Sequence, residues 1–185
     1  MDIMSEHRRK SQQDSWKYLT KLGAFITPKQ QDSGAFDPKT YTSRFDPESE
    51  RISFFRTEVE DHNLCKLTLD TLGICRSTLQ NVNFYRSDLK SAVFCWNNFH
   101  DCDFAHALLN HADLRGSVYK QCSFKHAILD GADLRISIFE MCSFLGASMK
   151  GTRLTYEIGD SLNLDSRQRD EIEWTDTDGP IPEGG

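Results

Sequence analysis

The 185-residue sequence lacks any uninterrupted apolar stretch of eighteen residues, so it predicts no membrane-spanning helix. No apolar core of a signal peptide lies near Met1, and we expect a cytoplasmic protein, or one exported without a cleaved signal. The six cysteines form no CxxC pair, and no paired histidine motif accompanies them. We therefore expect no metal and no cofactor, and we interpret Cys65, Cys75 and Cys95 as structural rather than reactive.

A catalytic set is also missing. His106 and His126 share a register, but no carboxylate is placed to orient either imidazole and no nucleophile lies beside them on the outer surface. We interpret them as solvated residues, with a pH-sensitive contact as the alternative. The sequence therefore predicts a protein that is not an enzyme.

Excess charge is absent from the middle of the chain. Residues 61–156 carry ten Lys or Arg and nine Asp or Glu, whereas residues 157–185 carry two basic and nine acidic residues. The net charge of -6 therefore resides in the C-terminal segment. Arg8, Arg9 and Lys10 form too short a basic run to indicate direct nucleic-acid binding, and we expect none.

What the chain does contain is a large apolar residue at every fifth position for nineteen consecutive pentads, from Leu64 to Leu154. Two positions earlier in each pentad stands, from Ser77 onward, a mostly small residue. Five residues advance an α-helix by about 500°, so this period would smear the apolar positions around a helix instead of forming a stripe. A long helix is excluded.

An extended backbone fits the same pattern. Residues two apart in a strand point to one side, so the small and the large residue of a pentad both face inward, and the two remaining residues turn a corner. Four corners make a square coil of twenty residues, and successive coils stack at about 4.8 Å per level. The pattern predicts an all-β solenoid of about five coils.

Individual pentads carry a further pattern. The pentads at 112–116 and 132–136 read A-D-L-R-G and A-D-L-R-I, and those at 87–91 and 102–106 read S-D-L-K-S and C-D-F-A-H. This sequence resembles the pentapeptide-repeat family, whose pattern is A-[DN]-L-x-x, over about half of its length. The resemblance implies a right-handed quadrilateral β-helix. In the first coil, His62, Leu67 and Leu72 are bulky for the inward position, so an irregular coil is expected there.

The twenty-residue register predicts which side chains stack inside the coil. Two aromatic ladders are expected, formed by Phe84, Phe104, Phe124 and Phe144, and by Phe99, Tyr119 and Phe139. Rings stacked in this way fill the bore, so no internal ligand pocket is predicted. Cys102, Cys122 and Cys142 occupy the small inward site, where sulfurs in a line cannot form a tetrahedral metal site.

Apolar residues at outward positions are candidates for partner binding. Leu108 and Ile128 lie on one face, Val118 and Ile138 on the opposite face, and Trp96, Ile136 and Tyr156 share a third register. Connected apolar patches mark interaction surfaces, although the same residues are favoured in strands for packing and the flanking segments could cover them.

The flanking segments suggest a division of the chain into 1–51, 52–156 and 157–185. The first contains a short helix over Ser5–Phe25, which carries Trp16, Leu19 and Leu22, followed by an extended arm. The second is the β-helix.

In the third segment, Asp165 to Gln168 has the form of a capping box ahead of a helix that ends near Trp174. We expect this helix to cover the open end of the solenoid, with Ile172 and Trp174 against Phe144, Met149 or Leu154. An acidic, flexible tail is expected after it.

Three functional hypotheses remain open. The leading one is a non-enzymatic module whose rigid walls bind an unidentified protein partner. The second is protection of type II topoisomerases by DNA mimicry, which the family resemblance implies for some members and which the neutral solenoid does not favour. The third is an enzyme or ligand binder that uses the N-terminal arm. A monomer is favoured over an end-to-end dimer, because a capping helix is predicted at the C-terminal end.

Overall fold

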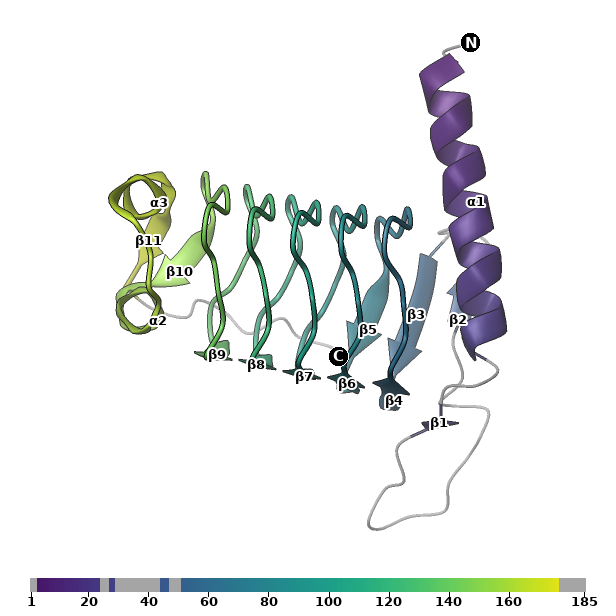
Figure 1. Ribbon diagram of the computed structural model, residues 1–185, viewed down its shortest axis with the longest axis horizontal. Helices are drawn as coiled ribbons and strands as arrows, with labels where there is room; N and C mark the ends of the chain where they lie inside the picture. Colours follow the sequence, from purple (N-terminus) through teal and green to yellow (C-terminus); the bar gives the residue numbers. More distant parts are fainter. Residues whose placement is uncertain (1–2, 24–26, 29–43, 47–50, 177–185) are drawn as a thin grey trace.

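The computed structural model describes residues 3–23, 27–28, 44–46 and 51–176. The chain winds into a parallel β-solenoid of about six turns, whose coils stand in a row in Figure 1. This confirms the predicted architecture. The stack is about one turn longer than expected, because strand pairing continues beyond residue 156 to residues 173–175 at the C-terminal end.

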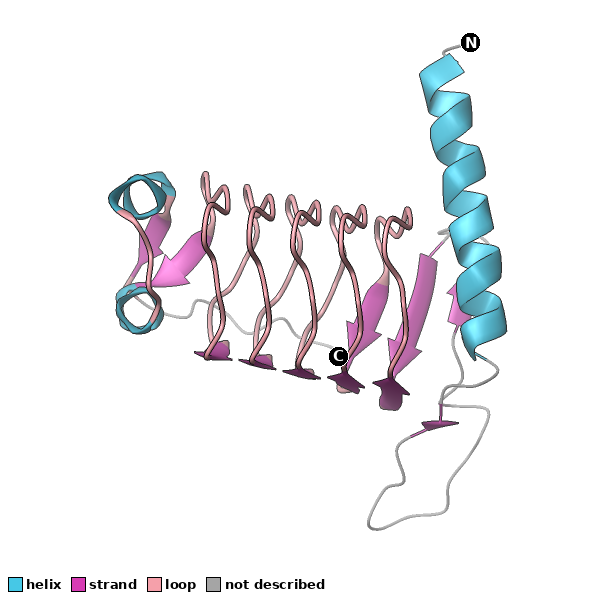
Figure 2. Cartoon of the chain, in the orientation of Figure 1, coloured by secondary structure: helices cyan, strands magenta, loops and turns pink. Residues whose placement is uncertain are grey.

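Strands occupy two walls of the solenoid (Figure 2). The larger sheet has the order β1-β4-β6-β7-β8-β9, and all of its pairs are parallel except β1 with β4. Its strands are β1 (Thr27–Pro28), β4 (Thr57–Glu60), β6 (Thr78–Gln80), β7 (Asn98–His100), β8 (Val118–Lys120) and β9 (Ile138–Glu140). The other strands are β2 (Arg44–Asp46), β3 (Arg51–Phe55), β5 (Gly73–Cys75), β10 (Arg153–Thr155) and β11 (Glu173–Thr175). Here β2 pairs antiparallel with β3, which pairs parallel with β5, and β10 pairs parallel with β11.

Every pairing between coils joins residues twenty apart, which gives the solenoid four walls. We number the walls by an outward residue in each: Asn98 with Val118 for the first wall, Asp103 with Ser123 for the second, Leu108 with Ile128 for the third and Asp113 with Asp133 for the fourth. The first wall is the six-stranded sheet, and the fourth contains β3, β5, β10 and β11. The quadrilateral cross-section predicted from the pentads is thereby confirmed.

The corners depend on an unusual backbone conformation. From Arg56 to Gly151, every fifth residue has a positive φ. The corner N–H donates to a carbonyl of the next coil, as His106 N does to Lys125 O at 2.9 Å, and this bond offsets the strain of a left-handed residue. At Gly131 the absence of a Cβ has a second use, because the His111 ring lies where that atom would be.

Stacked side chains fill the bore. Phe84, Phe104, Phe124 and Phe144 stack in sequence, with ring centroids 4.8, 5.0 and 4.9 Å apart and planes within 5°. Phe99, Tyr119 and Phe139 form a second stack with centroids 4.8 and 4.9 Å apart. Both ladders predicted from the sequence are confirmed. Each stacked pair contributes about 0.5–1.5 kcal/mol beyond the burial of its area.

The small inward positions satisfy backbone groups. Ser77, Asn97, Ser117 and Ser137 form a buried polar ladder in which each side-chain oxygen accepts the N–H of the residue one coil earlier. Cys102, Cys122 and Cys142 lie inward as expected, with sulfurs that donate to backbone carbonyls, and they are free thiols.

The helix α1 (Ile3–Gly23) covers the N-terminal end of the stack (Figure 1). Leu19 is buried in the hydrophobic core, and Ser15 Oγ accepts the N–H of Thr68 at 2.9 Å. In the next coil the equivalent N–H, that of Asp88, donates to Leu67 O. Ser15 therefore replaces a carbonyl of the coil that would precede the first one. The sequence predicted this helix but not its role as a lid.

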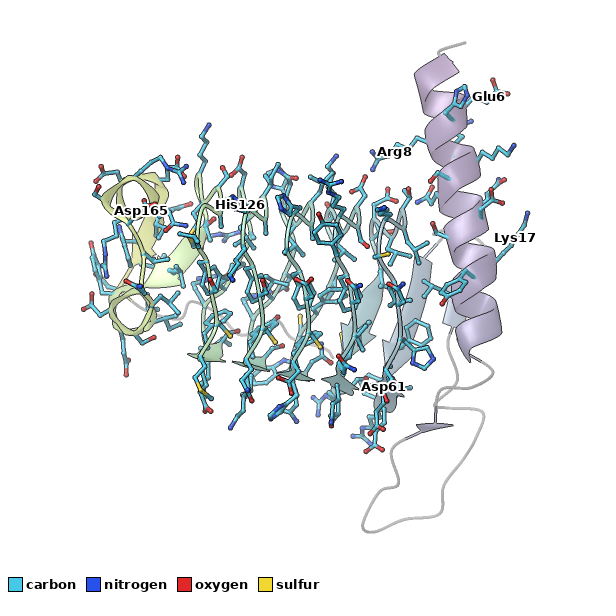
Figure 3. All side chains as sticks on the ribbon, viewed as in Figure 1. Glu6, Arg8, Lys17, Asp61, His126 and Asp165 are labelled. Atoms are coloured by element: carbon cyan, nitrogen blue, oxygen red, sulfur yellow. The ribbon has the colours of Figure 1, made fainter. Side chains whose placement is uncertain are left out.

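Polar side chains also join α1 to the stack. Arg8 extends from α1 toward the solenoid (Figure 3), and its Nη2 lies 2.9 Å from Asp88 Oδ2 and 3.4 Å from Asp70 Oδ2. Gln12 Nε2 donates to Asp70 Oδ1 at 2.9 Å. Because Asp70 and Asp88 belong to adjacent coils, these contacts hold the helix against both.

Two short helices close the other end, where one was predicted. They are α2 (Tyr156–Ser161) and α3 (Ser166–Glu171), and the predicted capping box of Asp165 and Gln168 is present at α3. Glu171 accepts the N–H groups of Met149 and Gly151, and Gln168 Nε2 donates to Phe144 O at 2.7 Å. The last coil thus finds partners in the cap in place of a further coil.

The position of Trp174 differs from the expectation. It lies in β11 rather than at the end of a helix, because residues 173–175 pair with β10 and add one more strand to the fourth wall. Trp174 is opposite Leu154 in this pairing, and Ile172 is buried with the core residues. Both residues thus lie at the C-terminal end of the stack.

A glycine corner tests the importance of the left-handed backbone. Gly151 has a φ of +63° and no heavy atom lies within 4 Å of the point that a Cβ would occupy, so alanine there would be strained without any clash. We expect Gly151→Ala to lower the free energy of unfolding by about 1 kcal/mol in urea titrations. Ser91→Gly is the reverse change at an exposed position of the same corner, with a φ of 55°, and should raise the free energy of unfolding, by up to about 1 kcal/mol. Equal stability of Gly151→Ala and wild type would contradict this account.

Candidate interaction surface

Four of the seven outward apolar residues form one continuous strip. Ile136 is the corner residue just before β9, and Ile138 is the first residue of β9. Val118 of β8 pairs with Ile138. The corner residue one coil before Ile136 is Gly116. The Trp96 ring lies over Gly116 and occupies the space that a Cβ of this glycine would need. We call Trp96, Val118, Ile136 and Ile138 the apolar strip. Ile138 is 54% exposed and Trp96 41%, whereas Val118 and Ile136 are half-buried.

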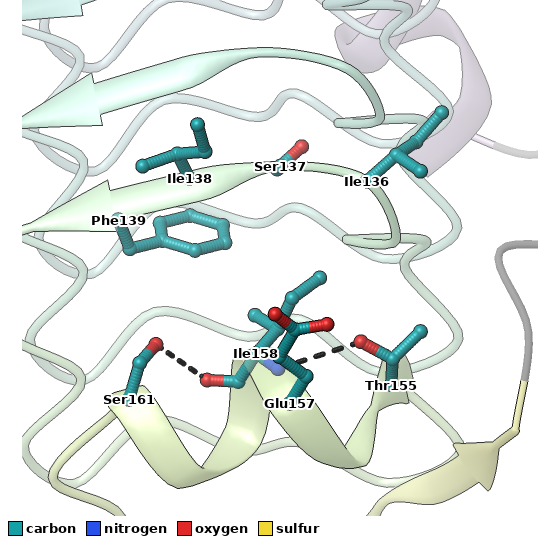
Figure 4. Close-up of a pocket in the computed structure, with 8 residues that line it drawn as sticks. All are labelled: Ile136, Ser137, Ile138, Phe139, Thr155, Glu157, Ile158 and Ser161. Atoms are coloured by element: carbon teal, nitrogen blue, oxygen red, sulfur yellow. Dashed lines mark hydrogen bonds between the residues drawn. The ribbon is translucent and has the colours of Figure 1, made fainter.

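A shallow groove continues the strip toward the C-terminal end (Figure 4). Its apolar lining comes from Ile136, Ile138 and Phe139 on one side and from Ile158 of α2 on the other. Ile158 N donates to Thr155 Oγ1, which holds α2 at a defined angle beside β9. The strip therefore ends in a depression whose lining combines these apolar residues with Ser137, Thr155, Glu157 and Ser161.

Leu108 and Ile128 lie apart from this strip. They pair with each other on the third wall, opposite the first wall, and both are half-buried rather than exposed as the sequence suggested. Val118 is likewise less exposed than expected. Side chains of neighbouring coils lie about 4.8 Å apart and shield one another, which a single coil viewed alone does not reveal.

Tyr156 is also separated from Trp96 and Ile136 in its contacts. Its ring stacks on Trp174 with centroids 5.0 Å apart and planes within 9°, so one face of the ring is engaged by the terminal cap. Tyr156 is still 55% exposed and extends the corner to the end of the solenoid.

Besides Tyr18 of α1, which is 42% exposed, the sequence analysis missed two exposed apolar residues of the coils. Met141, at the corner after β9, is 78% exposed, and Leu145 on the second wall is 64% exposed. Both occupy outward positions of the twenty-residue register, so the register would have revealed them. With Ile138, they place the greatest apolar exposure on the last full coil.

Ion pairs occupy the fourth wall. Arg115 and Arg135 each form a two-point pair with the aspartate two positions earlier, through Nε at 2.9 Å and Nη2 at 2.7 Å. Asp133 and Arg135 are only 6% and 8% exposed, so this pair is shielded from solvent. Burial opposes ionisation of Asp113, but the bonds from Arg115 outweigh it and hold the pKa of that carboxyl below its usual value.

Histidines and possible metal ligands form no further site. The His106 and His126 rings stack with centroids 5.0 Å apart at a corner between the second and third walls. Among residues 3–23, 27–28, 44–46 and 51–176, no cluster of three His, Cys, Asp or Glu residues could hold a metal ion. In the same part of the chain, no helix has the length and apolarity needed to span a bilayer.

The Asp113–Arg115 pair yields a testable stability difference. We expect Asp113→Asn to lower the free energy of unfolding by about 1 kcal/mol at pH 7, allowing for partial solvent screening. Because the pKa of Asp113 is lowered on folding, this difference is complete above about pH 4, the pKa of an unfolded aspartate, and is lost as the pH falls further.

Asp103→Asn is the matched control for this substitution. Asp103 accepts the N–H of Ala105 as Asp113 accepts that of Arg115, but no arginine stands beside it in the repeat. Asp103→Asn should therefore lower the free energy of unfolding clearly less than Asp113→Asn does. Equal losses in urea titrations of the two variants at pH 7 would contradict a stabilising role for the ion pair.

Comparison with known proteins identifies the repeat. The sequence pattern of pentapeptide repeats matches eight copies over residues 77–116, 97–135 and 120–155. No curated protein matches the chain. The fold is similar to that of a trypsin-treated form of QnrB1, a plasmid-mediated fluoroquinolone resistance protein, with 19% identity, 71% of each chain covered and a TM-score of 0.51.

A pentapeptide repeat protein from the Arabidopsis thaliana thylakoid lumen is also similar, with 20% identity, 75% of this chain and 80% of that chain covered, and a TM-score of 0.29. The likeness to QnrB1, at 19% identity, shows the fold alone. The eight matched repeats, which span residues 77–155, show that the repeat region belongs to the pentapeptide-repeat family.

Proposed function

We propose that this chain is a non-enzymatic protein-interaction module and that the apolar strip, with the groove beside β9, binds the partner. The observation that carries the proposal is that the exposed side chains of Ile138 and Trp96 lie in one strip with Val118 and Ile136, next to the groove beside β9. Connected apolar patches of this kind are typical of protein interfaces. Leu108 and Ile128 on the opposite wall form a second, less exposed candidate surface.

Rigidity supports the same proposal. Val118 is held between two neighbouring strands, and Ile136 and Trp96 occupy corners with a defined backbone. A surface that is already ordered loses little conformational entropy on binding. The strand β9 is also the last in its sheet, and among the described residues no later strand pairs with it. An extended apolar segment of a partner could therefore lie along β9 and enter the groove.

The surface is tested by two matched double variants. Val118→Asp with Ile138→Asp places charge on the apolar strip, and Leu108→Asp with Ile128→Asp does the same to the paired residues of the third wall. We expect affinity capture from a lysate of the source cells, quantified by mass spectrometry, to lose the specific partner at least tenfold with the first variant only. Far-ultraviolet circular dichroism and melting curves of both variants provide the control for folding.

Two results would contradict this assignment. Loss of the partner with the Leu108 and Ile128 variant alone would move the interface to the third wall. Equal capture by both variants and wild type would exclude both surfaces as the main binding site.

Topoisomerase protection is the second candidate, supported by the structural likeness to QnrB1. The ion-pair ladder weakens it, because Asp113 and Asp133 are each neutralised by an adjacent arginine and the wall does not present a row of free negative charges. In a gyrase supercoiling assay with a fluoroquinolone, the interaction proposal predicts no rescue. Rescue by substoichiometric protein would instead favour DNA mimicry.

The third candidate, an enzyme or ligand binder that uses the N-terminal arm, concerns a segment that lies mostly outside the described residues. A saturable signal in a screen for nucleotide binding and hydrolysis would support it over the interaction proposal. We also propose a monomer, since α1 and the pair α2 and α3 occupy the two ends of the stack.

A further inference from the structure

Two cysteines lie side by side on the outside of the fourth wall. Cys75 and Cys95 are twenty residues apart, and the backbone bonds from Ile74 N to Val93 O at 2.8 Å and from Arg76 N to Cys95 O at 3.2 Å place them in register on adjacent coils. Neighbouring positions of paired strands are separated by about 4.8 Å, which lies within the range of roughly 4.4–6.8 Å that disulfides span between Cα atoms. The backbone is therefore already placed for a bond between the two sulfurs.

The two thiols differ in their surroundings. Cys75 is half-buried, whereas Cys95 is 7% exposed. The Cys95 thiol donates a hydrogen bond to the Cys75 sulfur, which lowers the pKa of Cys75 to about 7 against the opposing effect of burial. Of the charged groups nearby, Arg76 lowers this pKa further and Asp113 raises it. The same hydrogen bond, burial and the Asp113 carboxylate raise the pKa of Cys95.

This arrangement places a half-buried sulfur with a lowered pKa beside a buried thiol with a raised pKa. A thiolate is the reactive form of cysteine, and reactive cysteines combine partial exposure with a neighbouring group that stabilises the anion. Redox-sensitive cysteines often have a second, resolving cysteine next to them. Cys75 and Cys95 meet these conditions on one wall.

We propose that Cys75 and Cys95 form an oxidation site that reacts with hydroperoxides and closes to a disulfide between two coils. The Cys75 thiolate attacks the terminal oxygen of the hydroperoxide, so an S–O bond forms while the O–O bond breaks. The leaving hydroxide or alkoxide takes up a proton and departs as water or an alcohol. Cys95 then gives up its proton and attacks the Cys75 sulfur, so an S–S bond forms while the S–O bond breaks, and water leaves. Two thiols are oxidised and one hydroperoxide is reduced; with hydrogen peroxide the products are the disulfide and two waters.

The other cysteines lack this combination. Cys65 is half-buried on the second wall. Its neighbour in register on the following coil is not a cysteine but Tyr85, whose N–H donates to Asn83 Oδ1. Cys102 and Cys122 are in register with each other, but both point into the bore and are buried. Cys65 is therefore a control for exposure without a partner, and Cys102 with Cys122 is a control for a partner without exposure.

The full-length protein with its natural cysteines provides the main test. We expect treatment with hydrogen peroxide at neutral pH, followed by alkylation and peptide mapping by mass spectrometry, to yield a peptide pair linked through Cys75 and Cys95, with Cys65 alkylated. Dithiothreitol should reverse the link. In the reduced protein, iodoacetamide should modify Cys75 about tenfold faster than Cys65 at pH 7, with a half-maximal rate near pH 7.

Two variants separate the steps. In Cys95→Ser, we expect hydrogen peroxide to leave a sulfenic acid on Cys75 that dimedone traps. In Cys75→Ser, we expect Cys95 to stay reduced, because the exposed thiolate is missing. Melting curves verify that both variants are folded.

Three results would overturn the proposal. Cys75 and Cys95 could both stay reduced under conditions that oxidise Cys65. The wild type could accumulate a sulfenic acid on Cys75 without the disulfide, which would exclude Cys95 as the resolving thiol. Alternatively, the disulfide could join the buried pair Cys102 and Cys122. This would show that two cysteines at equivalent positions of adjacent coils react whether or not they are exposed.

Discussion

The structure depends on the stacking of equivalent side chains at intervals of twenty residues inside a closed coil. Phe104 contacts the rings of Phe84 and Phe124 in nearly parallel planes, and no single coil could bury its rings without its neighbours. The same register aligns the backbone groups of adjacent coils, so core packing and hydrogen bonding select one geometry. Because the bore is filled from wall to wall, the outer walls and the ends are the surfaces available to a partner.

The two ends of such a stack need partners of another kind, because each terminal coil has a neighbouring coil on one side only. At the N-terminal end, Ser15 of α1 accepts the N–H of Thr68, and at the C-terminal end Glu171 accepts that of Met149. Side chains thus stand in for the missing coils. The first wall is the exception, since β9 has α2 beside it rather than a paired strand, and this leaves the groove and the exposed Ile138.

The period of five determines which residues point inward, so the walls and the aromatic ladders were predictable from sequence. Contacts between distant segments were not: the pairing of Ser15 with Thr68 depends on how a helix docks 53 positions away. Trp174 was assigned to a helix because a local capping box was visible, whereas pairing with Leu154 through the backbone was not. Exposure was also difficult to predict, since neighbouring coils shield Val118.

The most direct test of the central claim is a nuclear Overhauser experiment on protein with labelled phenylalanine rings. The account predicts cross-peaks from the Phe104 ring to the rings of Phe84 and Phe124, since their centroids lie 4.8 and 5.0 Å away. Cross-peaks from Phe104 only to residues adjacent in sequence, or rapid exchange of the Phe104 amide with solvent, would contradict a bore filled by stacked rings.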